Sequence, residues 1–311
     1  MSSMRSFAVV AALFGAMSVS AAPLDAPELT IRAPAAVMTE CTQPQTVAPT
    51  SDDGPHVNTK KLADLLDQNG AKGTWFVKGN NYGCIYDSNN AASVITSCSQ
   101  PNTAAITFDD GPYTWTRTIV DKLDAAGAKG TFFVNGKNFD CIYSGDNPSN
   151  LKYAYDQGHQ VASHTWSHPH LSTLSASQIE DELTRINTAI EGITGAVPAF
   201  IRPPYGEHNQ DVLDVAGRLG QTVVTWDLDS GDTGGASVDQ SLATYRTRVN
   251  ESPSSILTLN HETHSTTANE LLDEIIPLLQ GAGYSLVTVA ECVEMDPYLS
   301  QGEPTGPTGS C

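Results

Sequence analysis

The 311-residue sequence is poor in cationic side chains: 16 lysines and arginines stand against 35 aspartates and glutamates, a formal net charge of −19 at pH 7. A chain this acidic repels the phosphate backbone of nucleic acids and the anionic surface of a membrane. Its cysteines form no C-x-x-C pair, the common signature of a zinc knuckle. Beyond the first 21 residues, no apolar run approaches the roughly 20 residues of a membrane-spanning helix. We therefore expect neither nucleic acid nor membrane as a partner.

The N-terminal residues have the pattern of a secretory signal peptide. Arg5 precedes an apolar stretch over residues 7–19, and the small residues at 19–21 fit a cleavage site. We expect residues 1–21 to be removed and the protein to be secreted, extracellular or in a cell wall. The last ten residues lack the hydrophobic tail of a GPI signal. An even number of cysteines in a secreted chain indicates disulfides, although spacing leaves the pairing open; the six are Cys41, Cys84, Cys98, Cys141, Cys292 and Cys311.

The sequence contains an internal repeat. Residues 39–86 align with residues 96–143 at a constant offset of 57, and 27 of the 48 aligned positions are identical. In the first copy, Pro49 stands in place of Ile106, and Ser51 in place of Phe108. Proline removes a hydrogen-bond donor from a strand, and serine removes a core side chain. We interpret the first copy as a degenerate partial duplication within an N-terminal extension over residues 22–95; duplicated exons joined in a gene model are the alternative.

From residue 103 onward, segments with strand character alternate with segments with helix character. Short apolar runs predict strands at residues 104–108, 130–134, 160–163, 199–202, 221–226, 255–260 and 284–289. The segments between them predict helices at residues 115–126, 175–191, 209–219, 238–250 and 266–280. Such alternation builds a parallel sheet covered by helices. We predict an α/β fold, a distorted (β/α) barrel of about seven parallel strands.

Unusual polar residues follow five of the predicted strands. They are Asp109 with Asp110, His164 with His168, Arg202 with the residues up to Gly206, Asp227 with Asp229, and His261 with Glu262. The C-terminal ends of parallel strands meet at one rim, where the active sites of barrels and open α/β sheets lie. Five separate strands therefore deliver polar side chains to one place, which we predict to be the active site.

His164 and His168 have a spacing that lets both imidazoles bind one metal ion, although such a pair alone is a weak signal. The carboxylate of Asp110 would complete a set of two histidines and one carboxylate. Such a set leaves positions open for water and substrate, as catalytic metal sites do. The adjacent Asp109 could then accept the proton of an activated water.

Each of these features also has an ordinary structural interpretation. Asp-Asp-Gly-Pro is a common turn sequence, and Asp52 and Asp53 in the first copy illustrate it. Trp166 is expected to pack in the core rather than to stack on a ligand. Four further histidines are expected to be structural or on the surface: His159, His170, His208 and His264.

Four motifs occur in a fixed order: Thr107-Phe-Asp-Asp-Gly-Pro112, His164-Thr-Trp-Ser-His168-Pro169, Arg202-Pro-Pro-Tyr205-Gly206 and Leu257-Thr-Leu-Asn-His261-Glu262. They resemble the motifs of the NodB-homology polysaccharide deacetylases, carbohydrate esterase family 4. In sequence, they are most similar to the motifs of fungal chitin deacetylases. The resemblance covers about residues 96–295, which we expect to form the deacetylase domain, followed by a tail over residues 296–311.

The resemblance implies a role for each residue of the metal site and the base. Asp110, His164 and His168 would bind one divalent metal ion, most often zinc in such enzymes, with cobalt or another divalent ion as alternatives. Asp109 would be the general base, and Arg202 would pair with it to keep it ionised and oriented.

The resemblance also implies the acid and the substrate contacts. His261 would be the general acid that protonates the departing nitrogen, oriented and tuned by Asp229. The backbone N–H of Tyr205 would stabilise the oxyanion, and Leu259 would belong to the substrate side of the site. Thr233 departs from the family, which commonly carries a tryptophan there, so the groove wall would be smaller and more polar.

The activity implied is removal of N-acetyl groups from N-acetylglucosamine polymers, chitin or chitooligosaccharides, by a monomeric enzyme. Another acetylated polysaccharide, such as acetylxylan or peptidoglycan, is an alternative, and so is a catalytically silent carbohydrate-binding protein of the cell wall. A silent relative usually lacks a ligand or the base, whereas here the set is complete. We further expect Cys98, which opens the domain, to pair with Cys292, which closes it. Deletion of residues 39–95 is expected to leave activity intact.

Overall fold

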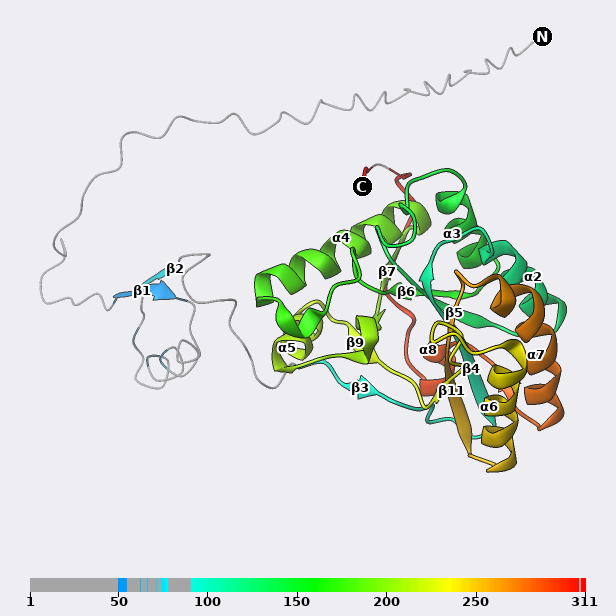
Figure 1. Cartoon of the computed structure of the whole chain (residues 1–311). Coiled ribbons are helices and arrows are strands. Elements are labelled where there is room, and N and C mark those ends of the chain that lie inside the picture. The colour runs from blue at the N-terminus through cyan, green and yellow to red at the C-terminus, as the bar shows by residue number, and fades with distance from the viewer. Residues whose placement is uncertain are drawn as a thin grey trace, which may run out of the picture.

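A computed structural model describes residues 50–54, 62, 66, 71, 74–77, 91–307 and 309–311. The expected signal peptide, Cys41 and Cys84 lie outside these residues. Over residues 91–307, a sheet of parallel strands is surrounded by helices (Figure 1). Within the described part of the chain, no helix combines the length and apolar character that crossing a membrane requires.

Eight strands form one continuous parallel series. Their order is β10 (Leu228–Asp229), β11 (Ser255–His261), β4 (Thr103–Gly111), β5 (Gly130–Val134), β6 (Gln160–Ser163), β8 (Phe200–Ile201), β9 (Thr222–Val224) and β3 (Val94–Ile95), and β12 (Ser285–Leu286) also pairs with β4. In the described residues β10 and β3 do not pair with each other, so the sheet curls into an open half-barrel. The predicted distorted (β/α) barrel is confirmed.

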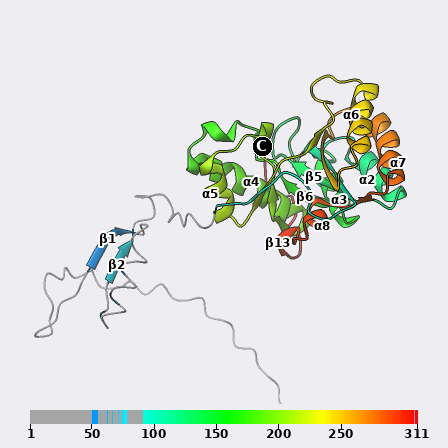
Figure 2. The same ribbon diagram turned by 90° about the horizontal axis from the view of Figure 1, so that it is seen from below.

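Helices cover the outside of the sheet (Figures 1 and 2). The longer ones are α2 (Thr116–Ala125), α3 (Asn147–Asp156), α4 (Ala176–Thr194), α5 (Gln210–Arg218), α6 (Val238–Asn250) and α7 (Leu272–Gly281), the last preceded by a π-helical turn, η3 (Thr267–Leu271). Neighbours contact one another in the spatial order α6, α7, α2, α3, α4, α5. The N-terminus of α4 is capped, since the side chains of Ser175 and Gln178 form a capping box.

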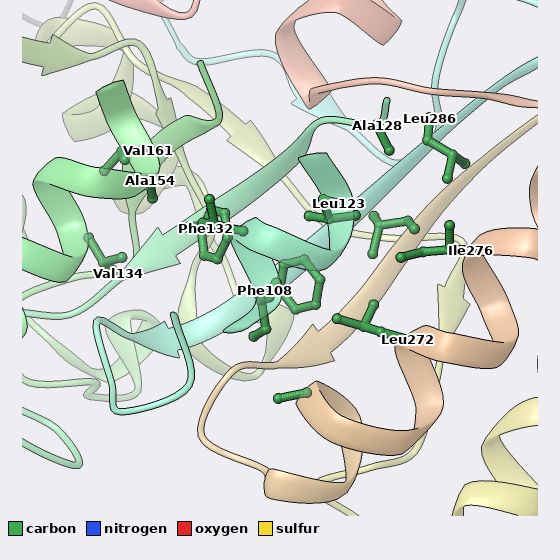
Figure 3. Packing of buried hydrophobic residues seen from close by; sticks show 14 of the residues in the cluster. Phe108, Leu123, Ala128, Phe132, Val134, Ala154, Val161, Leu272, Ile276 and Leu286 are labelled. Carbon is green, nitrogen blue, oxygen red and sulfur yellow. The ribbon is translucent and has the colours of Figure 1, made fainter. Parts of the chain in front are cut away.

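The main core lies between the sheet and the helices. Because side chains alternate along a strand, Ile106 and Phe108 of β4 enter this core together. The rings of Phe108 and Phe132 stack with centroids 5.3 Å apart, and Leu272 and other α7 residues pack over the same region (Figure 3). The next residue, Asp109, therefore faces the concave side of the half-barrel.

The folded unit extends beyond both limits predicted for the deacetylase domain. At the start, β3 lies before residue 96 and pairs with β9. At the end, helix α8 (Val289–Val293) is followed by β13 (Tyr298–Gln301), which pairs antiparallel with β7 (Ala196–Pro198). Two disulfides join these ends to the domain: Cys98–Cys292, as predicted, and Cys141–Cys311.

The first copy of the repeat has the strand pairing of the second. Strands β1 (Thr50–Gly54) and β2 (Thr74–Val77) are parallel and pair Thr50 with Thr74 and Gly54 with Val77. The positions 57 residues later, in β4 and β5, pair in the same register, and both pairs have an irregularity just before the glycine. The strand pairing of the repeated unit is therefore retained in the first copy.

Strand β3 lies within the deletion of residues 39–95, so a test of the repeat needs a deletion that ends before this strand. We expect a variant lacking residues 39–90 to keep wild-type activity, because the full site lies in later residues. A variant lacking residues 39–95 should lose about 2–4 kcal/mol of stability, since it removes the half-buried Val94 and Ile95 from the sheet. Thermal unfolding and activity of both variants measure this. Loss of activity in a folded 39–90 deletion would show that the first copy has a function.

Candidate active site and metal centre

Asp109 and Arg202 form a buried ion pair at the rim. Arg202 is fully buried, and its Nη1 lies 2.8 Å from Asp109 Oδ1 and 2.5 Å from Thr107 Oγ1. Its Nη2 donates to the Thr225 carbonyl at 2.9 Å, and the guanidinium lies 4.1 Å from the ring centroid of Phe133. These contacts fix one oxygen of Asp109 and leave Oδ2 facing His164 Nε2 at 3.6 Å.

Asp110, His164 and His168 converge as a potential metal-binding group. One ligand atom from each lies within 4.8 Å of the others. Asp110 Oδ1 is 3.8 Å from His164 Nε2 and 3.5 Å from His168 Nε2. Zinc ligands lie about 2.0–2.2 Å from the ion, which places neighbouring ligand atoms about 3.4 Å apart in a tetrahedral site. The spacing fits one small divalent cation.

The backbone is strained where these ligands project. Asp110, Thr165, His168 and Tyr205 have φ values of 74°, 72°, 58° and 60°. Non-glycine residues rarely adopt this left-handed conformation, and such residues cluster at functional sites where the surroundings hold them in place. The positive φ of His168 places this ligand outside a helix, directly before Pro169.

The protonation states of His164 and His168 suit metal binding. Burial lowers the pKa of His164, and burial together with His164 lowers the pKa of His168 to about 4. His164 Nδ1 lies 2.7 Å from the Arg202 carbonyl, so it carries the hydrogen, and Nε2 keeps its lone pair toward Asp110. Burial and the charge of Asp109 raise the pKa of Asp110 against the effect of His168. A divalent cation would relieve this penalty.

His261 is held by Asp232. Its Nδ1 lies 2.7 Å from Asp232 Oδ1, and its backbone N–H donates to Oδ2 at 2.8 Å. Burial acts to lower the pKa of His261, but Asp232 and the charges of Asp109 and Asp110 outweigh it and raise the pKa to about 9. Burial likewise opposes the ionisation of Asp232, yet its bonds to His261 and Thr267 lower its pKa. The imidazolium is therefore favoured at neutral pH.

The prediction that Asp229 orients His261 is wrong. Asp229 lies in β10, where Leu228 is buried, so the alternating side chain of Asp229 points outward and is exposed. Its Oδ1 accepts from the backbone N–H of Gly231 at 2.8 Å and so belongs to a turn. The chain reverses at Gly231, which has φ 73°, and brings Asp232 to His261 instead. Asp227 has a different partner: its Oδ1 accepts from the backbone N–H of Leu257 at 2.9 Å.

Two asparagines that the sequence analysis did not select support the metal ligands. Asn138 donates to Asp110 Oδ1 at 2.8 Å, and Asn135 donates to the backbone carbonyl of His164. Asn135 directly follows β5. The rule that located the other rim residues, polar side chains just after a strand, could have found it.

The remaining predicted residues lie as follows. Tyr205 is 55% exposed, between the ring of His170, stacked at 4.0 Å, and the edge of His168 at 4.9 Å. Leu259 is buried in β11 and pairs with Asp229. Trp166 is buried, as expected, under the guanidinium of Arg185 at 4.2 Å.

The other four histidines mostly follow expectation. His159 is buried and structural, with Nδ1 accepting from the Gly130 backbone N–H at 3.0 Å. His170 and His208 are exposed, and His264 is half-buried, its ring 6.0 Å from that of His261.

Comparison with known proteins agrees with this geometry. The family model described as "Polysaccharide deacetylase" matches residues 39–93 and 96–224. A chitin deacetylase of Pestalotiopsis is 37% identical over 65% of this chain and 67% of its own length. A probable peptidoglycan-N-acetylglucosamine deacetylase of Arthroderma benhamiae is 38% identical over 64% of this chain and 46% of its own, so this chain spans less than half of that relative.

The fold is also similar to that of a solved structure. The chitin deacetylase of Colletotrichum lindemuthianum superposes with a TM-score of 0.64 at 31% identity, covering 68% of this chain and 98% of that one. The family match, which covers more than half of the sequence, includes the first copy of the repeat as well as the main domain. The chain is a member of the polysaccharide deacetylase family.

Proposed function

We propose that this chain is a secreted, metal-dependent hydrolase that removes acetyl groups from N-acetylglucosamine polymers, with chitin or chitooligosaccharides as substrate. One observation carries the proposal: the buried Asp109–Arg202 ion pair, a potential metal-binding group and a histidine held by a carboxylate meet at one rim. Chitin and peptidoglycan deacetylases among the relatives support the polymer class, and the two disulfides support secretion.

The metal would be held by Asp110, His164 and His168. When bound, a divalent cation lowers the pKa of a water and polarises the acetyl carbonyl. Zinc suits the two imidazoles and one carboxylate, and cobalt could take its place.

The protein residues carry the proton transfers. Asp109, held in place by its ion pair with Arg202, accepts a proton from the attacking water through Oδ2. The water oxygen bonds to the acetyl carbon, and the backbone of Tyr205 stabilises the negative charge on the former carbonyl oxygen. His261 donates its Nε2 proton to the amide nitrogen as the carbon–nitrogen bond breaks. The products are acetate and a glucosamine unit.

Exposed aromatic rings flank the site and suit a sugar polymer. Tyr205 is 55% and Phe139 57% exposed, and Phe139 follows Asn138, the partner of Asp110. Apolar sugar faces pack on such rings. Thr233 is exposed beside Asp232, which supports a smaller and more polar groove wall at this position.

Acetate release tests the proposal. Purified protein should release acetate from chitooligosaccharides faster than from acetylated xylan or peptidoglycan, and a chelator should stop the release until zinc or cobalt is restored. Release that is insensitive to the chelator would contradict the metal site. Faster release from xylan or peptidoglycan would favour the alternative polymers. A folded, metal-loaded protein that releases no acetate from any of them would indicate a silent carbohydrate-binding protein.

A further inference from the structure

Glu262 is fully buried next to the acid His261, and the reaction described above gives it no role. Its backbone N–H donates to the carbonyl of Asp109 at 3.1 Å. Burial raises the pKa of its carboxyl group to about 8, despite the hydrogen bond to Thr116, and the charges of Asp110 and Asp109 act in the same direction as burial. A buried carboxyl group without a charged partner is costly and needs an explanation.

The hydroxyl of Thr116, in helix α2, holds this carboxyl group. Thr116 Oγ1 donates to Glu262 Oε2 at 2.5 Å and accepts from the backbone N–H of Tyr113 at 3.0 Å. The Tyr113 carbonyl also accepts from the backbone N–H of Thr116 at 3.2 Å and from the Asn150 amide at 3.3 Å, so the hydroxyl hydrogen is available to Glu262.

The same carboxyl group packs directly on the metal-ligand turn. A β-carbon added to Gly111 would lie 1.3 Å from Glu262 Oε1 and 2.0 Å from its carboxyl carbon, so only glycine fits there. Gly111 follows Asp110, whose left-handed φ of 74° must be held by its surroundings. Glu262 thus touches this turn by backbone at Asp109 and by side chain at Gly111, and ties it to helix α2 through Thr116.

We propose that Glu262 is a positioning residue: it holds the turn over residues 109–111 so that the Asp110 carboxylate faces His164 and His168. This inference rests on the metal site of the proposed function. Removal of the side chain should free the turn and weaken metal binding, whereas a neutral side chain of the same shape should preserve it.

Metal titration of the metal-free protein with zinc or cobalt tests the role without substrate. Glu262→Gln, whose side-chain oxygen can accept from Thr116, should bind within about twofold of wild type, and Glu262→Ala about 10–100-fold more weakly. Glu270→Ala, which removes an exposed glutamate of η3, is the matched control and should bind as wild type. Wild-type affinity in a folded Glu262→Ala would overturn the inference. Absence of binding in wild type would instead refute the proposed metal site.

A second pair of variants keeps the test valid if Glu262→Ala does not fold. Thr116→Val removes the hydroxyl that holds Glu262, and Thr116→Ser keeps it, so only the valine variant should bind metal more weakly. Equal affinity in the two would contradict the inference.

Discussion

Asp109→Asn should lower acetate release by about 10²–10⁴-fold while the protein still binds one metal ion. The reason is that the variant loses the basic oxygen Oδ2, whereas the three potential ligands are untouched. The amide can still lie beside Arg202, which keeps the local packing. Turnover on chitooligosaccharides and metal content of the purified variant measure the two effects separately.

His164→Ala is the matched comparison, because it removes a ligand rather than the base. We expect it to lose both metal and activity. If Asp109→Asn lost as much metal as His164→Ala, the division of labour between Asp109 and Asp110 would be wrong. Full activity in Asp109→Asn would show that another group takes the proton.

Asp232→Asn should lower turnover by a similar factor of about 10²–10⁴, and the loss should grow with pH. In wild type the pKa of His261 is raised from 6.5 to about 9, so the acid is protonated at neutral pH. Without the Asp232 carboxylate, burial, which lowers this pKa, is opposed only by the charges of Asp109 and Asp110, so the pKa of His261 falls. The variant should therefore lose its residual activity between pH 6 and 8, where wild type keeps its own. Profiles of kcat/KM against pH measure the shift.

Asp229→Asn is the control for that experiment. Asp229 is exposed and bonds only the Gly231 backbone among the contacts described, so its variant should stay within about twofold of wild type. The raised pKa of His261 also stabilises the fold, fully below pH 6.5 and no longer above about 9. Only Asp232→Asn should remove that dependence. A larger loss in Asp229→Asn than in Asp232→Asn would restore the original assignment.

The confusion between the two aspartates shows where sequence reasoning fails. Strands β5 and β6 and helix α6 begin and end where the apolar runs predict, because they are long enough to show a pattern. β10 has only two residues and shows none. Three carboxylates lie within residues 227–232, and only the turn at Gly231 decides which one meets His261.

The first and last strands of the domain could not be predicted from the sequence, for a related reason. β3 has two residues and β13 four, and their places depend on β9 and β7, which lie far away in the sequence. The rim, in contrast, was predictable, because His164, Arg202 and His261 each end or directly follow a strand, Asp109 lies near the C-terminal end of β4, and parallel strands deliver such residues to one edge. Glu262 was noted there, but its role depends on a buried contact with Gly111 that no pattern reveals.

Both disulfides have a consequence for oxidative folding during biosynthesis. Each joins a cysteine of the repeated segment, Cys98 or Cys141, to one of the last twenty residues, Cys292 or Cys311. Cys41 and Cys84 occupy the matching positions of the first copy. When Cys292 and Cys311 are synthesised, each therefore has two candidate partners, one in each copy. Local sequence cannot distinguish them. We expect the packing of Ile106 and Phe108 into the core, which Pro49 and Ser51 cannot reproduce, to favour the second copy. Closure of the half-barrel would then determine which cysteines form the disulfides.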